Sequence, residues 1–286
     1  MAGATKLMQF PTRARQNLNL PATSHAAYFK EEMSSDIVRL GDIIHSAVDF
    51  LFPRRCLVCG KINPKGKYAH FCDDCAPEAD ILRGARCLRC SEIIGGNSAF
   101  NVATCPHCSD NPPFFDRSLV AGSFANALRQ MVIELKYKGG TYLLSDISLL
   151  LKSVDTAQDF FENSVLVPVP LHFTRRLKRG YNQSAAICAA ITKAFPNSNI
   201  RIAEILRRVR RTPTQTTLDK GHREKNVKDA FRVAGAKVST PAIQKDARII
   251  VVDDVMTSSA TLSECARVLK ISGFCRVDAF ALARRL

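Results

Sequence analysis

The chain has 286 residues and a formal net charge of +15, from 41 Lys and Arg against 26 Asp and Glu residues. That length can hold one sizeable core and a smaller module, and no apolar run approaches the roughly 20 residues of a membrane-spanning helix. We therefore expect a soluble protein without membrane insertion. The surplus of positive charge suits a polyanionic partner, either nucleic acid or a phosphorylated ligand, although it can also merely aid solubility.

The first 45 residues predict a disordered tail or a misassigned start, because they show no sustained hydrophobic periodicity. The segment carries basic residues but no acid before Glu31, which slightly resembles a transit peptide, and it has no apolar core of a secretory signal. An amphipathic helix is predicted over 37–52, where apolar residues recur at helical spacing until Pro53 ends it.

Eight of the eleven cysteines form four CxxC pairs. Zinc takes four soft ligands in a tetrahedron, and each pair supplies two thiolates from one tight turn, so the pattern predicts two structural zinc ions. Metal binding indicates a reducing, cytoplasmic compartment, and a redox role fits poorly because four copies would be redundant. Sequential pairing of the motifs is simplest, interleaved pairing is possible, and His70 and His107 are interpreted as non-ligands. The predicted ligands are Cys56, Cys59, Cys72, Cys75, Cys87, Cys90, Cys105 and Cys108, in a helix and zinc-ribbon module over 46–112.

Helices and strands alternate after Pro112-Pro113, which predicts an α/β domain over 113–286 with a parallel sheet flanked by helices. The stretch at 212–231 is polar and lacks a core face. It predicts a mobile loop or hairpin that closes over a substrate, or a surface excursion without a role. The predicted strands are 116–124, 165–169, 248–252 and 276–282, and the predicted helices are 126–137, 143–151, 184–195 and 262–269.

Basic residues gather at the end of one predicted helix and after one predicted strand. Lys136 and Lys138 flank the end of a predicted helix, where they could contact a ligand or complement the helix C-terminus. A denser cluster follows the strand at 165–169 and includes Arg176 and Arg179. Loops at the carboxyl ends of parallel strands bind ligands in open α/β sheets, so these cations could neutralise a diphosphate. The alternative is a solvated loop or a nucleic-acid patch.

Two adjacent carboxylates, Asp253 and Asp254, follow the buried strand at 248–252. A loop of small and hydroxylated residues comes next and leads into a helix, so backbone N–H groups and the positive helix end converge on a site that suits phosphate. The carboxylates would repel a bare phosphate, but they suit ribose hydroxyls or a magnesium ion carried by a diphosphate. An ordinary strand-to-helix turn is the alternative. The candidate phosphate-binding loop consists of Thr257, Ser258, Ser259, Ala260 and Thr261.

The stretch RIIVVDDVMTSSAT resembles the phosphoribosyl diphosphate (PRPP) motif of type I phosphoribosyltransferases, in which two acids and a T-T/S-G-x-T loop follow a hydrophobic strand. Ser259 stands where that motif commonly has Gly, and a left-handed backbone there would strain Ser. The chain has neither a Walker GxxxxGK[ST] motif nor GxGxxG, which argues against P-loop and dinucleotide enzymes.

Over about residues 48–286 the chain resembles the ComF (competence protein F) family, through LFPRRCLVCG, LKYKGG, VPVPLHFTRRLKRGYNQS, RTPTQTTLDKGHREKNVKDAF and VVDDVMTSSATL. The resemblance implies a double zinc ribbon, a phosphoribosyltransferase-like domain that binds PRPP with Mg, and a link to the uptake of single-stranded DNA in natural transformation. It implies Asp253 and Asp254 as catalytic residues that stabilise a cation at the ribose. The expected partners are PRPP, single-stranded DNA and a competence helicase or other uptake proteins. The alternative is a non-catalytic module that binds single-stranded DNA or a protein partner.

Overall fold

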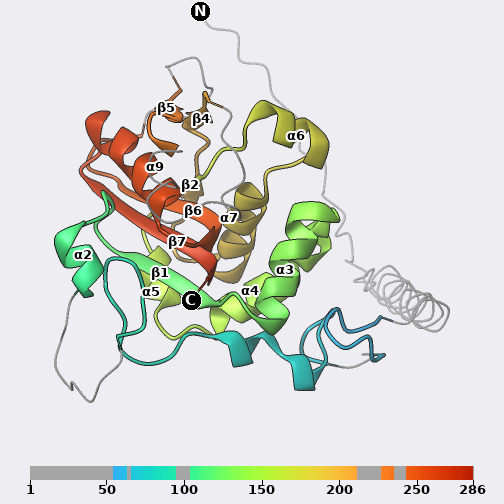
Figure 1. The fold of residues 1–286 in the computed structure, drawn as a ribbon. Coiled ribbons are helices and arrows are strands. Elements are labelled where there is room, and N and C mark those ends of the chain that lie inside the picture. The colour runs from blue at the N-terminus through green and yellow to red at the C-terminus, as the bar shows by residue number, and fades with distance from the viewer. Residues whose placement is uncertain (1–53, 63–65, 95–103, 211–226, 235–242, 286) are drawn as a thin grey trace, which may run out of the picture. The chain divides into compact units, whose positions relative to one another are not determined.

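A five-stranded parallel sheet organises the part of the chain that the structure describes (Figure 1). This computed structural model describes residues 54–62, 66–94, 104–210, 227–234 and 243–285, so the predicted tail and the predicted helix over 37–52 lie outside it. The strands lie in the order β1 (Ser118–Ser123), β7 (Arg276–Arg284), β6 (Arg248–Met256), β2 (Val165–Pro168) and β3 (Arg201–Ile202). All neighbouring strands in this sheet pair in parallel, which confirms the predicted α/β fold.

The central strand β6 is apolar on both faces. Ile249 and Val251 belong to one buried cluster, whereas Ile250 and Val252 belong to another. Successive side chains of a strand point to opposite faces, so this run requires a helical layer on each side. Figure 1 shows these layers, with α9 (Ala260–Ile271) on one face and the other long helices opposite it. The opposite layer contains α3 (Asn126–Tyr137), α4 (Leu144–Lys152), α5 (Ala157–Phe161) and α7 (Gln183–Ala194).

The strand order places a topological switch point between β2 and β6. The chain leaves β2 through α7 and returns to β3 at one edge, whereas it leaves β6 through α9 and returns to β7 on the other side. Where neighbouring strands send their connections in opposite directions, a crevice opens at their carboxyl ends. The carboxyl ends of β2 and β6 are therefore the place where this fold accommodates a ligand.

Several elements differ from the sequence-based expectation. Strand β6 continues to Met256, so the two acids lie within the strand and not after it. The basic segment after β2, predicted as a loop, forms the helix α6 (Phe173–Arg179). Helix α5 and strand β3 were not predicted.

The stretch predicted at 212–231 to lack a core face does bury residues at its end, because Val227, Ala230 and Phe231 are all buried. The antiparallel strands β4 (Leu206–Arg208) and β5 (Phe231–Val233) form a separate sheet, and both Leu206 and Phe231 are buried. This pairing agrees with the hairpin alternative. The intervening residues 211–226 lie outside the described residues.

The cysteine-rich module contacts the α/β domain through hydrogen bonds and through apolar packing. Tyr68 and Phe71 are buried in the same cluster as α3 and α4. Asp80, which ends the short turn η2 (Pro77–Asp80), accepts a hydrogen bond of 3.1 Å from the backbone N–H of Leu128 in the first turn of α3. Asp146 of α4 accepts one of 3.0 Å from the backbone N–H of Ala69. The remaining short elements are η1 (Asp73–Cys75), α2 (Pro106–Asp110) and η3 (Gly140–Leu143).

Candidate functional site

The eight predicted zinc ligands gather into two clusters in sequential pairing. The first cluster contains Cys56, Cys59, Cys72 and Cys75, and the second contains Cys87, Cys90, Cys105 and Cys108. Within each cluster the sulfur atoms all lie within 4.8 Å of one another, and one sulfur pair in each is 3.6 Å apart. A zinc–sulfur bond of about 2.3 Å places tetrahedral sulfurs about 3.8 Å apart. The clusters therefore fit two structural zinc ions.

Each cluster begins with the same backbone turn. The N–H of Gly60 donates to the carbonyl of Cys56 at 2.9 Å, and the N–H of Ser91 donates to that of Cys87 at 2.8 Å. Burial raises the pKa of these two thiols, but backbone N–H groups aimed at the sulfurs outweigh it and set the pKa at about 6 for Cys56 and about 7 for Cys87. The turns thus favour the thiolate, which is the form that binds zinc.

Neither histidine near the cysteines belongs to a cluster. The Nδ1 atom of His70 lies 2.9 Å from a carboxylate oxygen of Asp146, so its role is to hold the first ribbon against α4. His107 lies in α2 and faces a cavity instead. The interpretation of both as non-ligands agrees with this arrangement.

A cavity of about 190 Å³ opens at the switch point, and we call it the switch-point cavity. Five basic side chains and two carboxylates line it, which leaves a surplus of positive charge. The basic residues come from α3, α6, β4 and the chain end, so segments far apart in sequence converge here. The charged lining residues are Lys136, Arg175, Arg179, Arg208, Arg285, Asp253 and Asp254.

The two carboxylates differ in their partners. The Oδ1 atom of Asp254 lies 2.8 Å from Nζ of Lys136, whereas its buried Oδ2 has no hydrogen-bond partner among the described residues. Asp253 accepts hydrogen bonds from Oγ of Ser184 at 3.2 Å and from the backbone N–H of Asp254 at 2.9 Å. Loss of solvent, followed by the charge of Asp254, raises the pKa of Asp253 to about 7. Two adjacent carboxylates, one of which has an oxygen without a hydrogen-bond partner, form a site that favours a cation.

The loop after β6 forms a wall between two cavities. Thr257 and Thr261 line the switch-point cavity, whereas Ser258, Ser259 and Ala260 line a second one, which Thr257 also reaches. Ser259 has a φ of 61°, so this position does adopt the left-handed conformation that glycine usually supplies. For a residue with a side chain that conformation costs roughly 1–2 kcal/mol.

The structure brings only part of the predicted basic set to the switch-point cavity. Lys136 and Arg179 line it, but Lys138 pairs with Glu134 at 3.0 Å, and neither Lys138 nor Arg176 is among the lining residues. Arg175 takes the place expected for Arg176. Residues 175 and 179 share one face of α6 because they lie four apart in a helix, so recognising that helix would have identified the pair.

Arg208 and Arg285 are also cavity residues that the sequence did not identify. The basic run around Arg208 is visible in the sequence, but only the hairpin of β4 and β5 directs it toward the switch point. Arg285 follows the last strand, β7, and Arg284, the last residue of that strand, is buried, with only 6% of its surface exposed.

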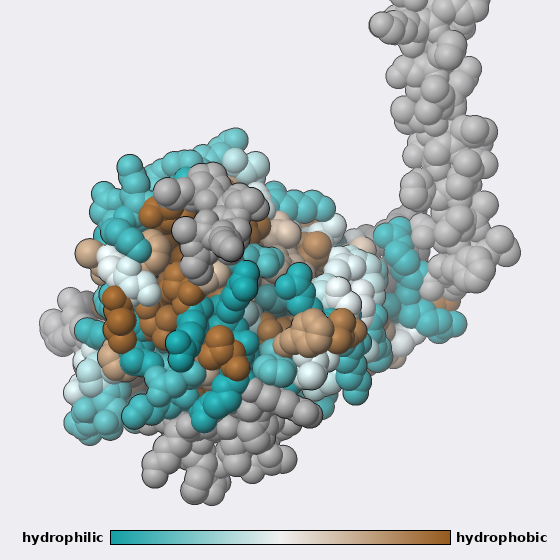
Figure 2. All heavy atoms as spheres, turned by 90° about the horizontal axis from the view of Figure 1, so that it is seen from above, coloured by the Kyte–Doolittle hydropathy of each residue, from teal (hydrophilic) through white to brown (hydrophobic). Residues whose placement is uncertain are grey.

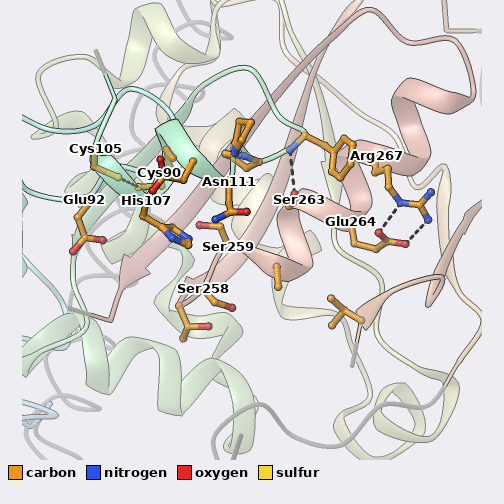
Figure 3. A pocket seen from close by; sticks show the side chains of 18 of the residues that line it. Cys90, Glu92, Cys105, His107, Asn111, Ser258, Ser259, Ser263, Glu264 and Arg267 are labelled. Carbon is orange, nitrogen blue, oxygen red and sulfur yellow. Dashed lines mark hydrogen bonds and ion pairs between the residues drawn. The ribbon is translucent and has the colours of Figure 1, made fainter. Parts of the chain in front are cut away.

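The second cavity has a volume of about 800 Å³ and lies between the second cysteine cluster and the first turn of α9 (Figure 3). We call it the ribbon–α9 cavity. Arg284 of β7 contacts the ribbon side of this cavity, because its guanidinium donates to the carbonyl of Cys90 at 2.6 Å and pairs with Glu92. Arg284 also pairs in register with Met256 on β6, directly before the loop. The second ribbon is thereby connected to the backbone that carries the candidate phosphate loop.

The fold and these clusters define an α/β protein with a parallel sheet and a cysteine-rich module that fits two zinc ions. Comparison with known proteins agrees: a model of the double zinc ribbon domain family matches residues 47–109. DNA utilization protein YhgH of Escherichia coli K12 is 30% identical over 186 residues, which cover 64% of this chain and 78% of that protein. The chain therefore belongs to the ComF family, which includes YhgH and competence protein F.

Two further relatives align over more of the chain. Competence protein F of Haemophilus influenzae is 25% identical over 226 residues, covering 74% of this chain and 96% of that protein. The YhgH protein of Salmonella typhimurium is 29% identical over 223 residues, covering 75% of this chain and 90% of that protein. In the part of the chain that the structure describes, no helix combines the length and hydrophobicity needed to cross a membrane.

Proposed function

We propose that the switch-point cavity binds PRPP, or a related phosphoribosyl diphosphate, together with Mg²⁺, and that this binding serves the uptake or use of DNA. The names of the relatives, a competence protein and DNA utilization proteins, support the second half of the proposal. The observation that supports the first half is the pair Asp253–Asp254 facing five basic side chains where the strand connections diverge.

The residues present fit a hard divalent cation beside an anionic ligand. Mg²⁺ prefers one or two carboxylate oxygens and takes its other ligands from substrate phosphates and water. The unpartnered Oδ2 of Asp254 is such an oxygen, whereas the Oδ1 of the same residue lies 2.8 Å from Nζ of Lys136. The surplus of basic side chains around the cavity would compensate a diphosphate.

A phosphoribosyl diphosphate would lie along the cavity with each part against matching chemistry. Its 5-phosphate would rest against Thr257 and Thr261, the two loop residues that line this cavity, at the positive end of α9. The ribose hydroxyls would face Asp253 and Asp254, and the diphosphate would face Arg175 and Arg179. If diphosphate leaves C1, positive charge develops on the ribose, and the nearby carboxylates would stabilise it electrostatically.

Titration calorimetry of zinc-loaded full-length protein with PRPP, with and without Mg²⁺, tests the proposal. We expect micromolar binding that requires Mg²⁺ and that the isosteric substitution Asp254→Asn weakens by at least about tenfold, since it removes a charged ligand oxygen. The matched control is Asp246→Asn, the same change at an exposed position, which should bind as wild type does. Absence of heat, or binding indifferent to both Mg²⁺ and Asp254→Asn, contradicts the proposal.

A second candidate function is a docking surface for single-stranded DNA, and α6 favours it. Phe173 and Leu177 on this helix are 67% and 68% exposed, and four basic residues surround them. Figure 2, which views the molecule from above Figure 1, shows hydrophilic and hydrophobic side chains interspersed on that face. Aromatic rings and cations side by side are the groups that hold single strands.

The dependence of binding on salt and on PRPP distinguishes the two candidate functions. Anisotropy of a labelled single-stranded oligonucleotide should report affinity that falls steeply with salt and drops on Phe173→Ala. Binding that is independent of salt and of Phe173 argues against the docking surface. A protein partner of the uptake machinery would then be the remaining form of this candidate.

A further inference from the structure

The ribbon–α9 cavity has the size and lining of a second ligand site. Ligand pockets commonly have volumes of about 300–1,000 Å³, and this cavity has about 800 Å³, several times more than the switch-point cavity. From the structure we propose that it binds a neutral, nucleobase-bearing ligand of about nucleoside size. This proposal goes beyond the binding of PRPP and holds whether or not the switch-point cavity takes that ligand.

One wall offers a flat apolar surface for a ring. Phe114 follows the rigid pair Pro112-Pro113, and all three residues line the cavity. The backbone N–H of Phe114 donates to Oγ of Ser263 in α9 at 3.1 Å, so the position of the residue is fixed. The residue is nevertheless 52% exposed. An aromatic side chain that is anchored through its backbone but left uncovered is suited to stack on a planar ligand.

Polar groups on both sides of the cavity are placed to form hydrogen bonds with the edge of such a ring. His107 and Asn111 come from the second ribbon, and Ser258, Ser259 and Ser263 come from the loop and α9 (Figure 3). An amide both donates and accepts hydrogen bonds, and so does a hydroxyl. A nucleobase carries donors and acceptors on its edge and apolar surface on its faces. The lining therefore matches its chemistry better than that of a purely aliphatic ligand.

The charge balance distinguishes this cavity from the switch-point cavity. Three acidic and three basic side chains line it, and most of them already compensate one another. Arg267 donates to Glu264 at 2.7 and 2.8 Å, and Arg284 pairs with Glu92. Zinc bound by four thiolates would add negative charge nearby. A dianionic ligand gains little here, whereas a neutral ligand is not repelled by that negative charge.

The proposal is tested by titrating adenosine, guanosine, cytidine and uridine into zinc-loaded full-length protein, with ligand-observed NMR followed by calorimetry. We expect saturable binding of at least one nucleoside. Phe114→Ala should weaken it by at least about tenfold, since base–aromatic stacking commonly accounts for a factor of that size. The control is Ile271→Ala, which removes a large exposed apolar side chain that lies outside this cavity and should leave the affinity unchanged.

Two further variants locate the site. Asn111→Ala should weaken binding and alter the ranking of the four nucleosides, because it removes a group that reads the ring edge, and its exposed position makes it safe for folding. Asp254→Asn should leave nucleoside affinity unchanged, because Asp254 lines only the switch-point cavity. The proposal is overturned if no nucleoside binds at millimolar concentration, if Phe114→Ala and Asn111→Ala both bind as wild type does, or if Asp254→Asn abolishes binding.

Discussion

Asp253 should destabilise the ligand-free protein at neutral pH, so that Asp253→Asn raises stability while it weakens ligand binding. Burial and the neighbouring Asp254 raise the pKa of Asp253 from 3.8 to about 7 in the folded state. The substitution keeps an oxygen that accepts the hydrogen bonds from Ser184 and the backbone of Asp254. It therefore removes the charge without removing the local structure.

The magnitude follows from the pKa values of the two states. In the folded state Asp253 holds its proton up to about pH 7, whereas in the unfolded state it releases it near 3.8, so wild-type stability falls as pH rises through this window. The full difference corresponds to about 4 kcal/mol. Because Asp253 keeps part of its surface in contact with solvent, we expect about half of that, about 2 kcal/mol, above pH 7.

Thermal unfolding of zinc-loaded wild type and Asp253→Asn at about pH 5 and about pH 8 measures this effect. For a domain of this size about 2 kcal/mol raises Tm by about 4–8 °C, and the increase should be larger at the higher pH. Asp246→Asn, at an exposed position, serves as the control and should change Tm little at either pH. A Tm increase that is absent, or equal at both pH values, would refute the assignment of a raised pKa to Asp253.

Three other substitutions test the geometry of the site. Ser259→Gly should raise Tm by about 1–4 °C, because relief of roughly 1–2 kcal/mol of left-handed strain exceeds the entropy cost of glycine; a lower Tm contradicts this. Lys136→Met should lower stability without Mg²⁺ by about 1–3 kcal/mol and strengthen the thermal shift with Mg²⁺, because it leaves Asp254 unpaired. An equal thermal shift with Mg²⁺ in both proteins would contradict competition between Lys136 and Mg²⁺ for the charge of Asp254. Arg284→Leu should speed zinc release to a colorimetric chelator, because it removes the donor to the carbonyl of Cys90; an unchanged rate excludes that role.

The sequence predicted the class of fold and the zinc clusters because both depend on local patterns. Four β-branched residues before Asp253 indicate a buried strand wherever they occur, and CxxC spacing specifies ligands through a single tight turn. The acidic pair lies near the carboxyl end of β6, within the strand and not after it as predicted, and its place beside the strand follows from the chain itself. The features that were predicted well are those that residues close together in the sequence determine.

The basic lining was predicted less well because it depends on tertiary arrangement. Arg208 reaches the switch-point cavity only because β4 pairs with β5, and no pattern near Arg208 encodes that pairing. Arg176 was chosen over Arg175 because the segment was interpreted as a loop. In a loop, unlike in a helix, the spacing of residues does not show which side chains point in the same direction. The buried position of Arg284 likewise depends on a ribbon that precedes it by almost 200 residues, which no local pattern reveals.

The second zinc cluster should support the phosphate loop, whereas the first should not. Arg284 connects the carbonyl of Cys90 to the strand position beside Met256, directly before the loop, and the first cluster has no such connection among the described residues. Cys108→Ser should therefore weaken PRPP binding more than Cys75→Ser does, although each removes one zinc ligand. Calorimetry on both variants, with zinc content measured in parallel, decides this. Equal losses of affinity at equal zinc content would mean that the ribbons act only through general stability and that the connection through Arg284 does not reach the loop.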